Sequence, residues 1–328
     1  MLIGFIAGVL YKYRFIDGYK NPTRSIYEKT HKGVVLIEVL QNDNKVSVGS
    51  GVLFKDETIY ILTAAHVIDD PRHIWIYATA HNPPREATLK ALNTFFDIAL
   101  LEFKEEFLPH DESLLELGDS DTLELGDPVW AIGSPLGIRN TITHGRVINK
   151  NVVIPGSPWM RVIISDTLFN SGSSGGPLIN IHGEIVGVNI SISGGGQEEN
   201  KPVLNLYTSL PINSVKKLLP SLKMGGKNTD PDFGVAILDS WKLNDNNFTS
   251  FNIKKPQVQG PIVLQIKEGS CGAKNDIRPG DIVIAMNNRN IKTTLEIFEL
   301  LFLEQVPLEG LHVVILRDRQ YIVKILTT

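Results

Sequence analysis

A short segment rich in glycine and serine, residues 170–178 ("NSGSSGGPL"), stands between two apolar runs. A nucleophilic serine needs bare backbone N–H groups beside it to stabilise an oxyanion, and glycine lets the backbone come that close. Ser174, which directly precedes two glycines, is therefore the predicted nucleophile. The predicted oxyanion hole is Gly172, Ser173 and Ser174, with the N–H groups of Gly172 and Ser174 as donors. Composition alone favours a Gly/Ser surface turn instead.

A serine hydroxyl is a weak nucleophile without a base, so a histidine and an acid are needed. His66 ("LTAAHVI") ends an apolar strand among small residues, although such a histidine taken alone is more typical of a core or strand end. Asp97 interrupts the apolar run "FFDIALL", where an unpaired carboxylate is costly, so it is the predicted buried acid. The order His66, Asp97, Ser174 is that of a chymotrypsin-type triad. It differs from the order in α/β-hydrolase esterases, whose acid and histidine follow the serine.

Short apolar segments between about residues 26 and 219 predict the strands that hold these side chains. They are rich in Val, Ile, Leu and aromatic residues, and Gly, Pro, Asn and Asp separate them. Many short strands at such spacing favour a β-barrel or sandwich over a βαβ sheet. One helix is expected over residues 212–219, and a polar linker follows at 220–232. Beyond it, a smaller unit combines strands with one amphipathic helix in "TTLEIFELLFLEQ".

The composition is ordinary for a globular protein that can bury a core, and a length of 328 residues makes two domains the first expectation. The net charge is −4 and no Lys/Arg-rich run occurs, so no nucleic-acid partner is expected. Cys271 is the single cysteine, which excludes an internal disulfide framework. The scattered histidines have no plausible metal-ligand spacing, so neither a metal nor a cofactor is predicted.

The N-terminal segment "MLIGFIAGVLY" is apolar for eleven residues and then meets Lys12 and Arg14. It is shorter than the roughly 20 residues of a membrane-spanning helix. A signal peptide would carry its positive charges before the apolar run. Two interpretations stay open: membrane association through residues 1–16 as an anchor, or a packing or oligomer segment. An extracytoplasmic location, periplasmic or membrane-anchored, is expected, with a cytoplasmic one as the alternative.

Six segments, in order, resemble the HtrA (Deg) serine proteases, and the resemblance covers nearly all of the chain. They are "SVGSGVLF", "LTAAHVI", "FDIALLEF", "LGDSDTLELGDPVWAIGSPLG", "THGRVI" and "SDTLFNSGSSGGPLINIHGEIVGVN", and "RPGDIVIAMNNRNI" resembles the family's PDZ domain. The resemblance implies a mostly β protein, with a chymotrypsin-like double β-barrel followed by a smaller PDZ domain. The expected limits are 1–24 for the N-terminal segment, 25–219 for the protease domain, 220–232 for the linker and 233–328 for the PDZ domain.

By that resemblance His66 is the general base, Asp97 orients it, and Ser174 attacks the scissile carbonyl of unfolded or misfolded proteins. One departure is Ser173, where the family usually has Asn. The alternative is a catalytically silent scaffold or chaperone whose PDZ domain binds peptides. Assembly as a homo-trimer through aromatic residues near the N-terminus is also implied; the candidates are Tyr11, Tyr13, Phe15, Tyr19 and Tyr27.

The fold that the resemblance implies also predicts two binding surfaces. The walls of the primary substrate pocket are Leu168, Ile190, Ser191, Ile192 and Leu206. None is acidic, so cleavage after small to medium aliphatic residues is expected. In the PDZ domain, the residues expected to bind a peptide C-terminus are Phe233, Gly234, Val235 and Ile237.

Overall fold

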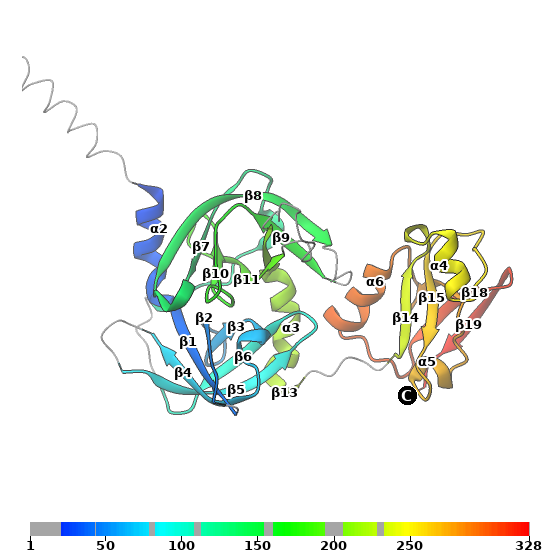
Figure 1. Cartoon of the computed structure of the whole chain (residues 1–328), viewed down its shortest axis with the longest axis horizontal. Coiled ribbons are helices and arrows are strands. Elements are labelled where there is room, and N and C mark those ends of the chain that lie inside the picture. Colours follow the sequence, from blue (N-terminus) through cyan, green and yellow to red (C-terminus); the bar gives the residue numbers. More distant parts are fainter. Residues whose placement is uncertain are drawn as a thin grey trace, which may run out of the picture. The chain divides into compact units, whose positions relative to one another are not determined.

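The structure is a computed structural model that describes residues 21–42, 44–78, 83–107, 113–153, 160–193, 206–227 and 233–327. It divides into two compact units, one around two β-barrels and one around a third sheet, and each is described by itself (Figure 1). Within these ranges, no helix is both long enough and apolar enough to span a membrane. The predictions for residues 1–16, and four of the five candidate trimer aromatics, lie outside the described residues.

The first barrel is closed by six strands that run in the order β4-β1-β2-β3-β6-β5, with β5 pairing back to β4. Alternate residues of β1, such as Val35, Ile37 and Val39, belong to its buried core, because side chains alternate between the faces of a strand. The strands are β1 (Val34–Gln41), β2 (Val46–Lys55), β3 (Ile59–Thr63), β4 (Pro71–Tyr77), β5 (Arg85–Asn93) and β6 (Ile98–Phe103). The short β13 (Gly226–Lys227) also pairs with β5.

The second barrel closes in the order β10-β11-β12-β9-β8-β7. Its core includes Val129, Leu178 and Val186, which are fully buried. The strands are β7 (Pro128–Gly133), β8 (Thr141–Val153), β9 (Arg161–Ser165), β10 (Pro177–Ile179), β11 (Ile185–Ser193) and β12 (Leu206–Pro211). The predicted double β-barrel is confirmed.

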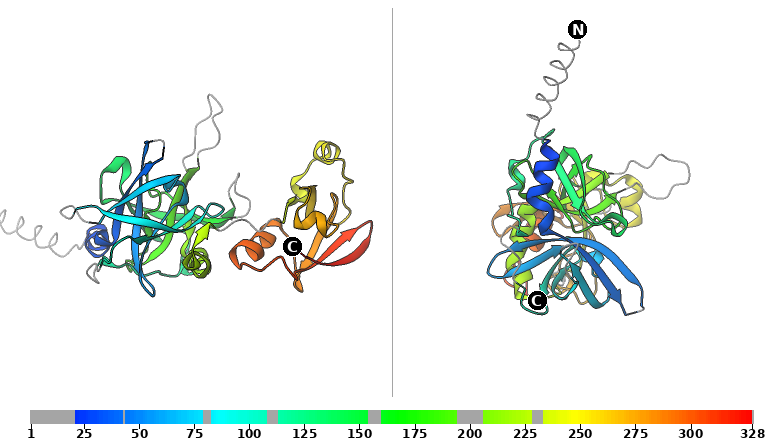
Figure 2. Two further views of the ribbon diagram at one scale, coloured as in Figure 1. Left: turned by 90° about the horizontal axis from the view of Figure 1, so that it is seen from below. Right: turned by 90° about the vertical axis from the view of Figure 1, so that its left-hand side faces the viewer.

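Among the described residues, two α-helices accompany the barrels. Helix α2 (Pro22–Thr30) begins at Asn21, whose side chain accepts from the N–H of Thr23. It lies along the second barrel (Figure 2), where the Thr23 hydroxyl accepts from Trp130 Nε1 at 2.9 Å. Helix α3 (Ile212–Met224) contains the predicted helix 212–219 and continues past Pro220. The first residues of the predicted linker 220–232 are therefore helical, and the predicted domain limits stay predictions.

The third sheet has the order β14-β15-β16-β18-β19, and β17 pairs with β16. Neighbouring residues of β15 enter different clusters: Ile262 packs with Phe248 of α4, whereas Val263 packs with Ile297 of α6. Helices α4 and α6 therefore cover opposite faces of the sheet. The elements are β14 (Val235–Asp239), α4 (Asp245–Ser250), β15 (Pro261–Ile266), α5 (Cys271–Lys274), β16 (Ile282–Met286), β17 (Arg289–Asn290), α6 (Thr294–Phe298), the wider turn η7 (Glu299–Leu303), β18 (His312–Arg317) and β19 (Gln320–Ile325).

Candidate active site

The glycines of the segment 170–178 let it pack against both barrels. A Cβ atom on Gly175 would lie 2.2 Å from the carbonyl oxygen of Ser50 and 2.2 Å from Thr63 Oγ1, on β2 and β3 of the first barrel. A Cβ atom on Gly176 would lie 2.3 Å from the carbonyl oxygen of Ile132 on β7. Only glycine fits at such approaches, and Gly175 also has a φ of +84°. The segment is therefore a tightly held turn between two rigid barrels, and not a flexible linker.

The two adjacent serines of the segment differ in exposure. Ser173 is 4% exposed, and its Cβ lies 3.2 Å from where a side chain on Gly133 would begin. Ser174 is only partly buried. Of the two hydroxyl groups, the one on Ser174 is thus the one that faces accessible space.

The four backbone carbonyls of residues 171–174 each accept a hydrogen bond. They are Ser171 from Leu136 N–H (2.9 Å), Gly172 from Ser50 Oγ (2.7 Å), Ser173 from Gly176 N–H (3.1 Å) and Ser174 from Ser50 N–H (2.8 Å). The C=O and N–H of one planar trans peptide point in opposite directions. Fixing the carbonyls of Ser171 and Ser173 therefore directs the N–H groups of Gly172 and Ser174 away from those contacts. Neither N–H donates to another group of the described residues.

His66 lies in the short helical turn η2 (Ala65–Val67) after β3, with its side chain half exposed. Its Nδ1 is 2.7 Å from Asp97 Oδ2, and its backbone N–H donates to Asp97 Oδ1 at 2.9 Å. Two bonds from one carboxylate fix both the ring and the backbone of His66. The nucleophile segment lies beside the turn that carries His66, because Gly175 packs against the backbone N–H of Ala64.

Asp97 occupies the turn before β6 with a left-handed φ of +54°, a conformation that Asp adopts more readily than most residues. Its side chain is 25% exposed, so it is less buried than the apolar run suggested, because it stands in a turn and not within the strand. The hydrogen bond that the His66 ring donates to Asp97, reinforced by the negative charge of Asp97, raises the pKa of His66 against the opposing effect of burial. No hydrogen bond joins the side chains of His66 and Ser174, both described; this contact is often long in substrate-free enzymes.

The predicted substrate pocket is only partly described. Leu168 is 61% exposed, whereas Ile190 is 2% exposed on β11, where the register with β12 shifts. For Ser191, Ile192 and Leu206 the structure describes the backbone alone, and their side chains lie outside the described residues. The pocket stays a prediction.

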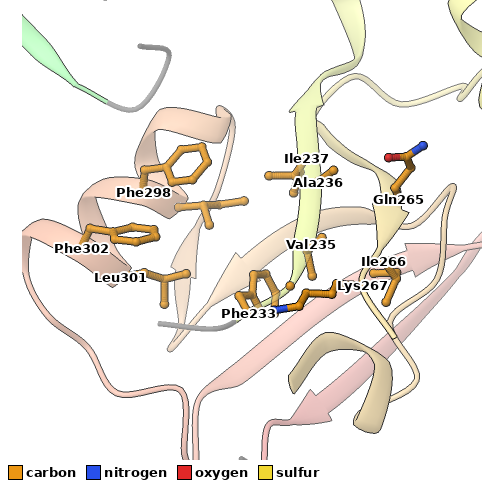
Figure 3. A pocket seen from close by; sticks show the side chains of 12 residues that line it. Phe233, Val235, Ala236, Ile237, Gln265, Ile266, Lys267, Phe298, Leu301 and Phe302 are labelled. Atoms are coloured by element: carbon orange, nitrogen blue, oxygen red, sulfur yellow. The ribbon is translucent and has the colours of Figure 1, made fainter. Parts of the chain in front are cut away.

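The third sheet carries a cavity of about 710 Å³ between β14 and the helical segment α6–η7. Phe298, Leu301 and Phe302 face Val235 and Ile237 across it (Figure 3). All four predicted peptide-binding residues line it: Phe233, Gly234, Val235 and Ile237. Strand β14 is an edge of the sheet and pairs only with β15 among the described strands.

The turn before β14 has a fixed backbone. The carbonyls of Phe233 and Gly234 accept from the N–H groups of Gly272 (2.9 Å) and Lys267 (2.8 Å). Gly234 has a φ of +63°, and a Cβ there would lie 2.0 Å from Ser270 Cβ. The segment 239–257 packs α4 on the opposite face of the sheet, and none of its residues lines the cavity.

Three residues that hold the nucleophile segment were not predicted from the sequence: Ser50, Ser134 and Leu136. Ser50 is completely buried and bonds to Gly172 and Ser174, while the other two lie in the turn after β7. One signal was present in the sequence. The glycines of "SVGSGVLF" stand inside a strand, where glycine often marks the close approach of another backbone.

Comparison with known proteins agrees with this architecture. Residues 49–188 match the family model of the trypsin-like peptidase domain. The chain is 34% identical over 248 residues, 75% of its length, to a protein from Pseudomonas putida (strain GB-1) named probable periplasmic serine endoprotease DegP-like. A protein of the same name from Hahella chejuensis is 33% identical over 256 residues, 76% of this chain. These alignments cover 48% and 50% of the two relatives, so the chain spans about half the length of the curated relatives it matches.

Solved structures share the fold. The match to the HtrA-type protease AlgW with a decapeptide covers 92% of this chain and 96% of that chain, with a TM-score of 0.75 and 20% sequence identity. The match to the serine endoprotease from Yersinia pestis covers 94% of this chain and 98% of that chain, with a TM-score of 0.71 and 22% sequence identity. The chain thus matches the trypsin-like peptidase domain, is similar to proteins named DegP-like serine endoproteases, and shares the fold of HtrA-type proteases.

Proposed function

We propose that the chain is a serine endopeptidase that hydrolyses peptide bonds of unfolded or misfolded proteins. Ser174 is the nucleophile, His66 the general base and Asp97 the residue that orients His66. The observation that carries the proposal is the two-point bond between Asp97 and His66, next to a turn whose Gly172 and Ser174 N–H groups have no partner among the described residues.

The reaction follows from these positions. Ser174 Oγ attacks the scissile carbonyl carbon while its proton passes to His66 Nε2, and the oxyanion that forms accepts from the N–H groups of Gly172 and Ser174. His66 then protonates the leaving amine as the C–N bond breaks, which leaves an acyl group on Ser174. Water attacks the acyl-enzyme with His66 again as base, and release of the carboxylic acid restores Ser174. Asp97 stabilises the imidazolium in both halves of the reaction.

Digestion of unfolded casein by the full chain tests this proposal. Ser174→Ala should abolish turnover while leaving the circular dichroism spectrum unchanged, since loss of a triad member costs several orders of magnitude in rate. Ser173→Ala is the matched control and should keep most of the activity, because the side chain of Ser173 is buried against Gly133. Retained turnover in Ser174→Ala would refute the assignment.

A catalytically silent peptide-binding protein is the second candidate, favoured by the open apolar groove beside β14. The two functions separate cleanly in one experiment. A wild-type chain that neither digests casein nor reacts with a fluorophosphonate, yet binds peptides, would support the silent binding protein. Covalent labelling that disappears in Ser174→Ala would support the enzyme.

The substrate preference remains part of the proposal. No acidic residue stands among the predicted pocket walls, so a Lys or Arg side chain would be buried there without a partner, and small to medium aliphatic residues are favoured. Mass spectrometry of casein fragments measures the preference. A majority of cuts after Lys, Arg, Asp or Glu would contradict it.

The groove beside β14 is proposed to bind the C-termini of peptides, which would add as a strand to the free edge of β14 while the N–H groups around Gly234 bind the terminal carboxylate. Equal affinity for free and amidated peptides would refute carboxylate binding.

Assembly as a homo-trimer is proposed from the resemblance to the family, and light scattering during size-exclusion chromatography measures it. An extracytoplasmic location is proposed because the relatives carry periplasmic names; cell fractionation tests it.

A further inference from the structure

Ser50 joins the first barrel to the nucleophile segment through its backbone N–H and its hydroxyl group. The residue lies on β2 and is completely buried, so it touches no substrate. Its four hydrogen bonds are Oγ to Gly172 O (2.7 Å), Ser134 N to Oγ (2.8 Å), Ser50 N to Ser174 O (2.8 Å) and Thr63 Oγ1 to Ser50 O (2.7 Å).

The hydroxyl group of Ser50 acts as a bridge with a defined direction. It accepts from the N–H of Ser134 and donates to the carbonyl of Gly172, so the turn after β7 and the nucleophile segment are held through one oxygen atom. Bonds arranged in such a chain polarise one another and strengthen. The same turn also supplies the Leu136 N–H that binds Ser171. The carbonyls on both sides of Gly172 are thus fixed from one place.

The backbone at Gly172 depends on these hydrogen bonds more than the backbone at a residue with a side chain would. It has a φ of +96° and no Cβ, so its two adjacent peptides rotate with little steric resistance. A Cβ would lie 2.5 Å from the carbonyl of Ser134, so no bulkier residue can replace it and stiffen the turn. Without the Ser50 hydroxyl, the buried carbonyl of Gly172 would lack its donor, and the Gly172–Ser173 peptide would rotate towards another one. This peptide joins the two peptides that carry the N–H groups of Gly172 and Ser174, so both donors would lose their alignment with the oxyanion.

We propose that Ser50 is a positioning residue for catalysis, which holds the Gly172–Ser173 peptide and thereby keeps the N–H groups of the two adjoining peptides, those of Gly172 and Ser174, directed at the oxyanion. The inference rests on the proposed function, because it concerns the oxyanion of that reaction. Ser50 acts on kcat through the tetrahedral intermediate and not through binding of the extended substrate. Its effect is therefore distinct from a general loss of stability.

The test compares the full chain with Ser50→Ala, which deletes the hydroxyl, and Ser50→Cys, which keeps its volume but is a weak donor. Both variants should lower kcat roughly 10- to 100-fold with KM within about threefold, somewhat less than the 10²–10³ that follows direct loss of an oxyanion donor. Affinity for a peptide boronate, which places a tetrahedral oxyanion in the site, should fall by the same factor as kcat/KM. Activity is measured well below the unfolding temperature of each variant.

Ser120→Ala is the matched control, since Ser120 is also buried and accepts from a backbone N–H, that of Asn213 in α3, away from the nucleophile segment. It should lose stability without losing kcat. Three results would overturn the inference: wild-type kcat in Ser50→Ala, wild-type kcat in Ser50→Cys alone, which would show that volume and not the hydroxyl matters, or unchanged boronate affinity. A wild-type chain that shows no activity would instead overturn the proposed function, and the inference with it.

Discussion

Replacement of Asp97 by Asn is the substitution that probes the geometry most directly. Both carboxylate oxygens are in use, Oδ1 by the backbone N–H of His66 and Oδ2 by its ring Nδ1. An amide has only one oxygen. If that oxygen keeps the backbone N–H, its NH₂ group faces Nδ1, and Nδ1 must then become an acceptor. The ring proton is thereby moved to Nε2, the atom that has to take the proton of Ser174.

The expected loss in kcat/KM is about 10⁴-fold, the precedent for a carboxylate-to-amide change that imposes the wrong tautomer. This loss corresponds to about 5.5 kcal/mol of transition-state stabilisation. The fold should survive, because Asn tolerates the φ of +54° as well as Asp does, and the amide keeps one bond to His66. The free energy of unfolding should fall by no more than about 1–2 kcal/mol.

The pH dependence supplies a second readout of the same contact. Only unprotonated His66 can act as base, so kcat/KM falls as the pH drops through the pKa of His66. The hydrogen bond and charge of Asp97 raise that pKa, and Asp97→Asn removes the charge. The acid limb of the residual activity should therefore move to lower pH than in the wild type.

A fluorogenic peptide assay over about pH 5–9, the range in which histidine titrates, measures both quantities. Ser174→Ala defines the background rate, and Asp69→Asn makes the same change at an exposed position three residues after His66. Activity of Asp97→Asn within about tenfold of wild type would refute the reasoning, since the precedent is about 10⁴-fold. An acid limb that moves to higher pH would contradict the assigned cause of the pKa shift.

Two further substitutions test the third sheet. Gly234→Ala should weaken binding of a free-carboxylate peptide at least about tenfold, because a positive φ and the contact with Ser270 exclude a Cβ. Fluorescence anisotropy measures the affinity, and an unchanged affinity would remove Gly234 from the binding site. Asp281→Asn should lower the free energy of unfolding by about 3 kcal/mol, the range for breaking a buried ion pair. The Asp281 side chain is 1% exposed and accepts two hydrogen bonds from Arg317, at 2.7 and 2.8 Å. Urea titration of the full chain tests this, and a loss below about 1 kcal/mol would place the pair among surface ion pairs.

The sequence alone was enough to predict the chemistry and the class of fold. The residue types His66, Asp97 and Ser174, their order, and the glycines beside Ser174 are local features that can be read without coordinates. The strand pattern predicted a β-barrel or sandwich for the same reason, since alternation and turn residues are encoded within a few positions. The double barrel was implied by the resemblance to the HtrA proteases. The helix at 212–219 was predicted too short, because the continuation past Pro220 depends on the packing of the helix.

Only the tertiary structure decided which backbone groups hold the nucleophile segment. Ser50 and Gly172 are 122 residues apart in the chain, and Leu136 donates to Ser171 from a third segment. No local pattern states which strand will meet which turn, because that depends on how two barrels close and pack. The glycines after Ser174 already favoured it over Ser173 in the sequence, and the structure adds that Ser173 is buried against Gly133. Residue identity therefore determines which reactive groups are available, whereas contacts between distant segments determine how these groups are oriented.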